Sequence, residues 1–95
     1  MSALERANQA WAHKVAELGG EAAAELNRAR HLFGPMHGPH EAVGVIEEEF
    51  LEFRSAAFWG VDQRGRPADP RAEAIQLAAM ALRFVLDVAD KADKR

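Results

Sequence analysis

The sequence predicts an all-α fold, a helical bundle of about four helices that is completed by homo-oligomerisation. Apolar residues recur at steps of three and four along most of the 95 residues, and no alternating run is long enough to form a strand. Glycine and proline divide this pattern at Gly19-Gly20, Gly34-Pro35 and Asp69-Pro70. The length fits one domain, residues 1–95.

The first two helices are predicted on either side of Gly19-Gly20, which we expect to end or bend the first one. Ser2-x-x-Glu5 forms a capping box at the start. The second helix runs from Glu21 to Phe33 and stops at Gly34-Pro35. The apolar face consists of Leu4, Ala7, Trp11, Val15 and Leu18 on the first helix, and of Ala22, Leu26, Ala29 and Phe33 on the second.

The third helix is expected from about Pro39 to Trp59, with Pro39 at its first position. Each residue advances by ~100° around the axis, which makes Phe50 the centre of a predicted core stripe. Glu49 falls inside the apolar arc beside that stripe. The stripe also holds Val43, Ile46, Phe53 and Ala57, and the arc continues over Ala42, Ala56 and Val45.

Glu49 is therefore in an unusual place for a surface carboxylate. A lone carboxylate among apolar groups should be protonated, paired or bound to a cation. Glu52 lies one turn further on, and Glu48 and Glu41 line the same border, so they add negative charge. This pattern predicts a metal or substrate site, whereas Glu47 points to solvent.

The last helix is predicted from the Asp69-Pro70 cap to about Asp90. Apolar residues cover most of its circumference, and a helix of this kind must be surrounded. We expect a homo-oligomer, a dimer or a tetramer, with a central helix in a monomeric bundle as the alternative. The polar residues lie in one stripe of Glu73, Gln76, Arg83, Asp87 and Asp90.

The amino-acid composition excludes some classes of function and disfavours others. The chain has no cysteine, which excludes disulfides and thiolate metal sites, and its net charge of −3 disfavours binding to duplex nucleic acid. It contains no apolar run of membrane-spanning length and no signal-peptide pattern at its start, so we expect a cytoplasmic protein with no membrane partner. Three arginines around the connector, Arg64, Arg66 and Arg71, either contact phosphates or are simply solvated.

Two helices together resemble a known family. Glu49-x-x-Glu52, a spacer of twenty residues and Glu73-x-x-Gln76 resemble the ExxE…ExxD motif of the MazG-like, all-α nucleoside triphosphate pyrophosphohydrolases. The run from His40 to Ile46, which precedes the acidic cluster, and the run Gln76-x-Ala-Ala-Met-Ala-x-Arg83 are also similar to the phage and bacterial subgroup. The resemblance covers about residues 32–88, and it leaves residues 1–19 as an extra or interface helix.

The resemblance implies hydrolysis of a ribo- or deoxyribonucleoside triphosphate to the monophosphate and pyrophosphate, with Mg²⁺ or Mn²⁺ held by carboxylates on two helices. Mg²⁺ prefers oxygen ligands and keeps several waters, so a few carboxylates and the substrate phosphates suffice. Carried over to this chain, Glu49 and Glu52 are the catalytic residues, Glu73 is a third metal ligand, and Glu48 adjoins them.

Gln76 occupies the position where the motif has Asp. Its amide oxygen can ligate Mg²⁺, but it lacks charge and is a poor general base. Two alternatives therefore stay open. One is a catalytically impaired relative that binds nucleotide or serves as an interaction module, and the other is a purely structural helical bundle.

Four further residues are candidate substrate contacts. His37 and His40 lie in or beside the Gly-Pro turn, and without a Glu-x-x-His pair they favour capping or substrate contact over a di-iron site. Trp59 shares the angular border of Glu48 and Glu52, which makes it the best aromatic candidate for stacking on a base. Arg83 completes the motif on the last helix and is assigned to the substrate.

Overall fold

The computed structural model describes residues 1–92 and is all-helical, as predicted. Three long helices follow one another within these residues: α1 (Ala3–Phe33), α2 (Pro39–Trp59) and α3 (Pro70–Phe84). A π-helical segment, η1 (Val85–Ala89), and a short α4 (Asp90–Ala92) continue directly from α3. None of these helices is both long and apolar enough to cross a membrane.

α1 corrects the prediction of a break at Gly19-Gly20. The helix passes through both glycines, neither of which has a positive φ. A glycine inside a helix costs only about 1 kcal/mol relative to alanine, and the flanking alanine- and glutamate-rich segments favour helix strongly enough to absorb it. The predicted capping box is confirmed, because Ser2 Oγ accepts from Glu5 N at 3.1 Å and Ser2 N donates to Glu5 Oε1 at 3.3 Å.

The predicted bounds of α2 and the predicted start of α3 are confirmed, but the last helix, expected to reach about Asp90, changes from α to π geometry at Val85. α2 begins at Pro39 and ends at Trp59, and its C-cap is Gly60, whose left-handed φ of 69° favours glycine. Asp69 caps α3 by accepting from Arg71 N at 3.0 Å. The connector between α2 and α3 is pinned by Asp62, which accepts from the backbone of Arg64 and Arg66, and by one antiparallel bridge between Val61 and Pro67.

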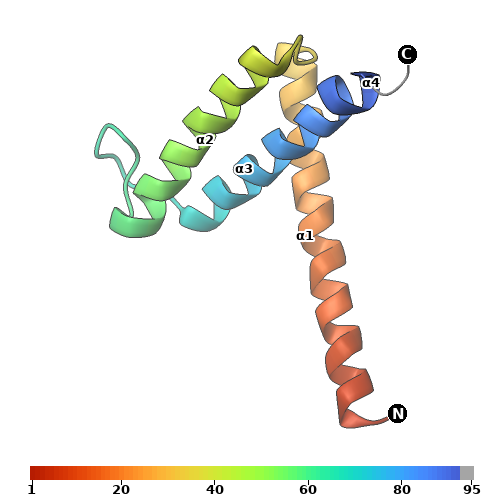
Figure 1. Cartoon of the computed structure of the whole chain (residues 1–95). Helices are drawn as coiled ribbons and strands as arrows, with labels where there is room; N and C mark the ends of the chain where they lie inside the picture. Colours follow the sequence, from red (N-terminus) through yellow and green to blue (C-terminus); the bar gives the residue numbers. More distant parts are fainter. Residues whose placement is uncertain (93–95) are drawn as a thin grey trace.

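α2 and α3 lie side by side and antiparallel, and the C-terminal half of α1 crosses α3 (Figure 1). The N-terminal half of α1 projects away from the other helices as an arm (Figure 1). The core is small and sits where the three helices meet. It consists of Leu26, Ala29, Met36, Ala42, Ala79 and Met80, with Val45, Ile46, Phe84 and Val88 packed against them.

The predicted core stripe on α2 was wrong in its centre. Phe50 and Val43 are 46% and 53% exposed, whereas Ala42 and Ala56 are buried. α2 therefore turns the arc that contains Glu49, rather than the Phe50 stripe, toward the rest of the chain. The reason is that small side chains at Ala42 and Ala79, both fully buried, let α2 and α3 pack closely.

α3 shows the same inversion. Of its predicted polar stripe, Arg83 and, on η1, Asp87 are each only 5% exposed, Glu73 and Gln76 are half-buried and Asp90 is exposed, while Leu82 and, on η1, Leu86 are 46% and 48% exposed. The sequence argument required neighbours on nearly all sides of this helix, and residues 1–92 of one chain do not supply them.

Candidate functional site

The three long helices enclose a cavity of about 380 Å³ at the place where they meet. α2 contributes Glu41, Val45, Glu48 and Glu49, and α3 contributes Gln76, Met80 and Arg83. The C-terminal half of α1 and the connector that follows it supply the remaining lining residues. A volume of this size is within the usual range of small-molecule sites, and the walls combine apolar and charged groups as such sites do.

Among the carboxylates of this site, Glu49 has the least favourable environment for a negative charge. Its Oε2 is buried and has no hydrogen-bond partner within the described chain. Desolvation raises the pKa of Glu49 above its ordinary value of 4.5, and repulsion from other carboxylates raises it further. Those carboxylates are, in decreasing order of effect, Glu73, Glu52, Glu25 and Glu48.

Glu73, on the facing helix α3, also has a raised pKa. Desolvation is the largest cause of its raised pKa, followed by repulsion from Glu52 and then from the connector acids Asp62 and Asp69. Glu52 and Glu73 lie outside the cavity lining, one turn beyond Glu49 and Gln76 respectively, yet their charges still act on this region. The fold therefore brings the motif carboxylates of two helices into one electrostatic cluster.

The cluster is not a preformed metal cage. Among residues 1–92, no three carboxylate or imidazole groups are close enough together to hold a metal ion as they stand. The donor set nevertheless fits a hard divalent cation, because it consists of carboxylate and amide oxygens and includes the unpartnered Glu49 Oε2. Glutamate side chains on facing helices would have to rotate toward a shared ion.

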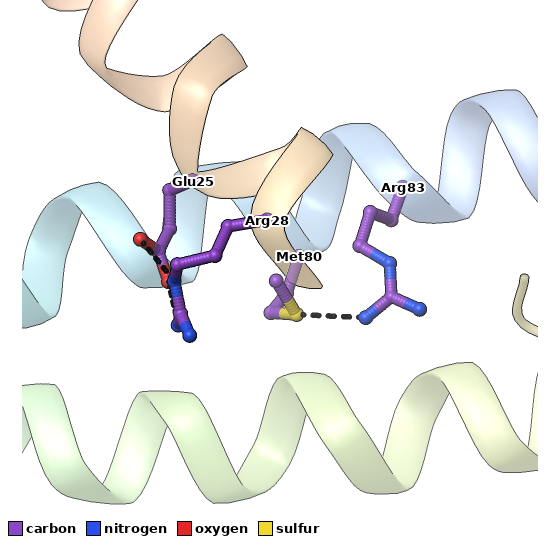
Figure 2. Close-up of polar contacts among 4 residues, drawn as sticks. All are labelled: Glu25, Arg28, Met80 and Arg83. Carbon is purple, nitrogen blue, oxygen red and sulfur yellow. Dashed lines mark hydrogen bonds and ion pairs between the residues drawn. The ribbon is translucent and has the colours of Figure 1, made fainter. Parts of the chain in front are cut away.

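α1 adds two charged residues that the motif did not include, Glu25 and Arg28. Arg28 Nε donates to both carboxylate oxygens of Glu25, at 3.2 and 3.1 Å, and Figure 2 shows this pair pointing from α1 toward α2. The pair with Glu25 raises the pKa of Arg28, and the negative charge of Glu49 adds a smaller contribution. Their signal in the sequence was position, since Glu25 and Arg28 flank the buried Leu26 and Ala29 at the edge of the apolar stripe.

Arg83 is held inside the site. One Nη donates to Gly34 O at 2.7 Å and the other to Met80 Sδ at 3.4 Å, while its Nε is buried without a partner. Figure 2 shows the side chains of Met80 and Arg83 pointing from α3 toward α2. Asp87 joins η1 to α1 and to the connector after α1. Its Oδ2 accepts from Met36 N at 2.9 Å, and its Oδ1 pairs with Arg30 at 3.2 Å.

His37, His40 and Trp59 are not part of the cavity lining. His37 is exposed and donates through its backbone N to Glu41 Oε2 at 3.1 Å, with its Nδ1 at the same distance. His40 is exposed and is not part of the cavity lining. Trp59 is 68% exposed at the far end of α2, where it meets Phe58 edge to face with ring centroids 5.6 Å apart.

Two of the three arginines around the connector, Arg66 and Arg71, pair with carboxylates of the chain. Arg71 forms a bidentate pair with Glu21 of α1, at 2.8 and 2.6 Å, and Arg66 Nε donates to Asp62 at 2.9 Å. Both pairs are exposed. The Arg71–Glu21 pair joins the start of α3 to α1, and the Arg66–Asp62 pair lies within the connector, so both arginines have a structural alternative to the predicted phosphate contact.

Comparison with known proteins adds no identification. No protein-family model, curated protein or solved structure matches this chain.

Proposed function

We propose that this protein hydrolyses a ribo- or deoxyribonucleoside triphosphate to the monophosphate and pyrophosphate, with Mg²⁺ or Mn²⁺ as cofactor. The observation that carries the proposal is Glu49, a carboxylate with one buried, unpartnered oxygen among four other carboxylates. Burying such a group without a counter-charge is unfavourable, and a divalent cation would remove the cost. The motif resemblance supplies the class of reaction.

In this proposal Glu48, Glu49, Glu52 and Glu73 hold the metal, with Gln76 as a neutral oxygen ligand. A bound Mg²⁺ would polarise the phosphates and neutralise the charge that develops on them. Glu49 would accept the proton of the attacking water, and Glu52 would orient that water. The water oxygen joins the α-phosphorus as the bond from that phosphorus to the bridging oxygen breaks, and pyrophosphate leaves.

The predicted substrate contacts are supported unequally. Arg83 lines the cavity, and His37 reaches its edge through Glu41. His40 and Trp59 lie outside it in the single chain, so their assignment rests on the sequence argument alone. We retain all four as proposed contacts and give Arg83 the central position.

We also propose that the working form is a homo-oligomer. Large apolar residues are exposed on the α1 arm, on α2 at Val43 and Phe50, and on the outer face of α3 and η1 at Leu82, Val85 and Leu86. These surfaces would complete a bundle of four or more helices if they packed against a second copy.

A substrate panel tests the activity directly. The folded protein is incubated with ribo- and deoxyribonucleoside triphosphates plus Mg²⁺ or Mn²⁺, and pyrophosphate is measured. We expect metal-dependent pyrophosphate release for at least one substrate. Absence of product across the panel would refute hydrolysis. Calorimetry then separates the two alternatives, because nucleotide binding without turnover identifies an impaired relative and no binding identifies a structural module.

Glu49→Gln tests the residue on which the proposal depends. Loss of a group that takes the proton from water costs about 10²–10⁴-fold in rate, so turnover should fall by at least the lower figure. Glu47→Gln is the matched control, since Glu47 lies on the same helix but is exposed and outside the cavity lining. Unchanged turnover in a folded Glu49→Gln protein would remove Glu49 from the site.

A further inference from the structure

The cavity has a second end, away from the residues proposed to hold the metal. Along α2 its lining residues Glu41, Val45 and Glu49 follow at four-residue steps, and Gln76 and Arg83 line it from the antiparallel α3. The carboxylate end is therefore at Glu49 and Gln76, and the other end is at Glu41 and Arg83. Eight helical residues separate Glu41 from Glu49, which corresponds to ~12 Å along the axis.

The middle of the cavity is apolar. Met36 and Met80 are 3% and 5% exposed, and Ala29 and Val45 complete the walls. Thioether side chains are polarisable and pack well against the faces and edges of aromatic rings. This section can accept a flat ring whose polar edge reaches the charged pair at the end.

The two charged groups at that end have complementary hydrogen-bonding roles. Glu41 is an acceptor, and hydrogen bonds from His37 together with the charge of Arg83 hold the pKa of Glu41 below its usual range. Arg83 is only a donor. Its two Nη atoms donate to Gly34 O and to Met80 Sδ, and the sulfur is a weak acceptor. Its buried Nε has no partner in the described chain.

We propose that the Glu41–Arg83 end is a nucleobase subsite and that its base is guanine. The assignment rests on the proposed function, because it places the phosphates at Glu49. Guanine is the base that offers two neighbouring donors, N1–H and N2–H₂, to a carboxylate and two neighbouring acceptors, O6 and N7, to a guanidinium. These groups follow one another around its edge, as the adjacent Glu41 and Arg83 require.

Equilibrium binding of nucleoside monophosphates in the presence of Mg²⁺ tests the subsite, because monophosphates are not hydrolysed and the cation offsets the repulsion between phosphate and carboxylates. We expect GMP to bind more tightly than AMP, CMP or UMP. A bidentate contact to a base typically discriminates by about tenfold or more, so Glu41→Gln should weaken GMP binding by that factor. Glu47→Gln on the exposed side of α2 should leave the binding of GMP unchanged.

Modified bases test each contact without disturbing the buried Arg83. IMP lacks the N2 amine, so it should bind less tightly than GMP to the wild-type protein, and the difference should shrink in Glu41→Gln. The 7-deaza analogue of GMP lacks the N7 acceptor, so it should lose affinity equally in both proteins. Equal affinities for the four bases, or a GMP preference that Glu41→Gln does not reduce, would overturn the subsite.

This result is independent of turnover. Triphosphate hydrolysis with no preference for guanine in binding would overturn the subsite and leave the proposed function standing. Guanine-selective binding that depends on Glu41, in a protein that hydrolyses nothing, would refute the proposed function and keep the subsite.

Discussion

Glu49 links the electrostatics of single residues to the stability of the fold. Its pKa is raised in the folded protein, so the folded state holds the Glu49 proton more tightly than the unfolded state does. That contribution to stability is fully present below the unfolded pKa, near 4.5, and is lost as pH rises through the higher folded value. Once pH exceeds the folded pKa, the ionised carboxylate of Glu49 destabilises the fold unless a cation neutralises it.

Thermal melts between pH 4 and pH 8 test this at the residue scale. Glu49→Gln mimics the protonated carboxyl, so without metal it should raise Tm at pH 8 and have little effect at pH 4. Mg²⁺ should reverse the order, because it stabilises the ionised wild-type site and gains less from the amide. A Tm difference that is independent of both pH and Mg²⁺ would contradict this account.

At the scale of the element, α1 shows that two consecutive glycines need not end a helix. Gly19 and Gly20 both have helical backbone, and a Cβ added at either one would meet nothing within 4 Å. Gly60 is different, because its φ of 69° lies where L-residues with a Cβ are strained. The same residue type thus weakens one helix and ends another.

Alanine substitutions at these glycines should have opposite effects. Gly19→Ala and Gly20→Ala should each stabilise the protein by about 0.5–1 kcal/mol, because alanine loses less entropy in a helix than glycine does. Gly60→Ala should destabilise it by about 1–2 kcal/mol through left-handed strain. Urea denaturation monitored by circular dichroism measures all three, and destabilisation at Gly19 would indicate that α1 bends there in solution.

At the scale of the whole molecule, the chain is too open for a compact monomer. Its radius of gyration is 16.1 Å, against about 12 Å for a compact domain of this length. It exposes 6924 Å², against about 5,400 Å² for a folded monomer of its mass. The excess exceeds the ~800 Å² that each partner buries in a standard interface, so a second copy has enough surface to bind.

The α1 arm is the clearest part of that surface. Its apolar stripe is continuous with the buried Ala22, Leu26 and Ala29, but Leu4 and Trp11 are each 71% exposed. We expect an apolar stripe that is buried at one end and exposed at the other to be covered in the assembled protein.

Light scattering with size-exclusion chromatography tests the arm. The wild type should elute as a dimer or larger, and Trp11→Ser should shift it toward monomer, since interface aromatics often contribute 2 kcal/mol or more. Gln9→Ser, on the opposite side of the arm, is the control and should leave the assembly intact. A wild-type monomer, or an assembly indifferent to Trp11, would exclude the arm as the interface.

The sequence by itself determined the helical class, both ends of α2, the start of α3, the capping box and the unusual position of Glu49. These are local properties, because they depend on side-chain periodicity, cap chemistry and proline or glycine placement within a few residues. The continuity of α1 was missed, since helix strength on both sides of Gly19-Gly20 outweighs the glycines.

Only the tertiary structure decided which faces meet. Periodicity ranks faces by apolarity, and on that basis Phe50 was placed at the core, but the close approach of Ala42 and Ala79 buries the other face of α2. The same packing brings Glu25 and Arg28 of α1 over Glu49 and puts Arg83 inside the cavity. Contacts between residues fifty positions apart depend on how the helices pack together, and no local pattern within one helix specifies that.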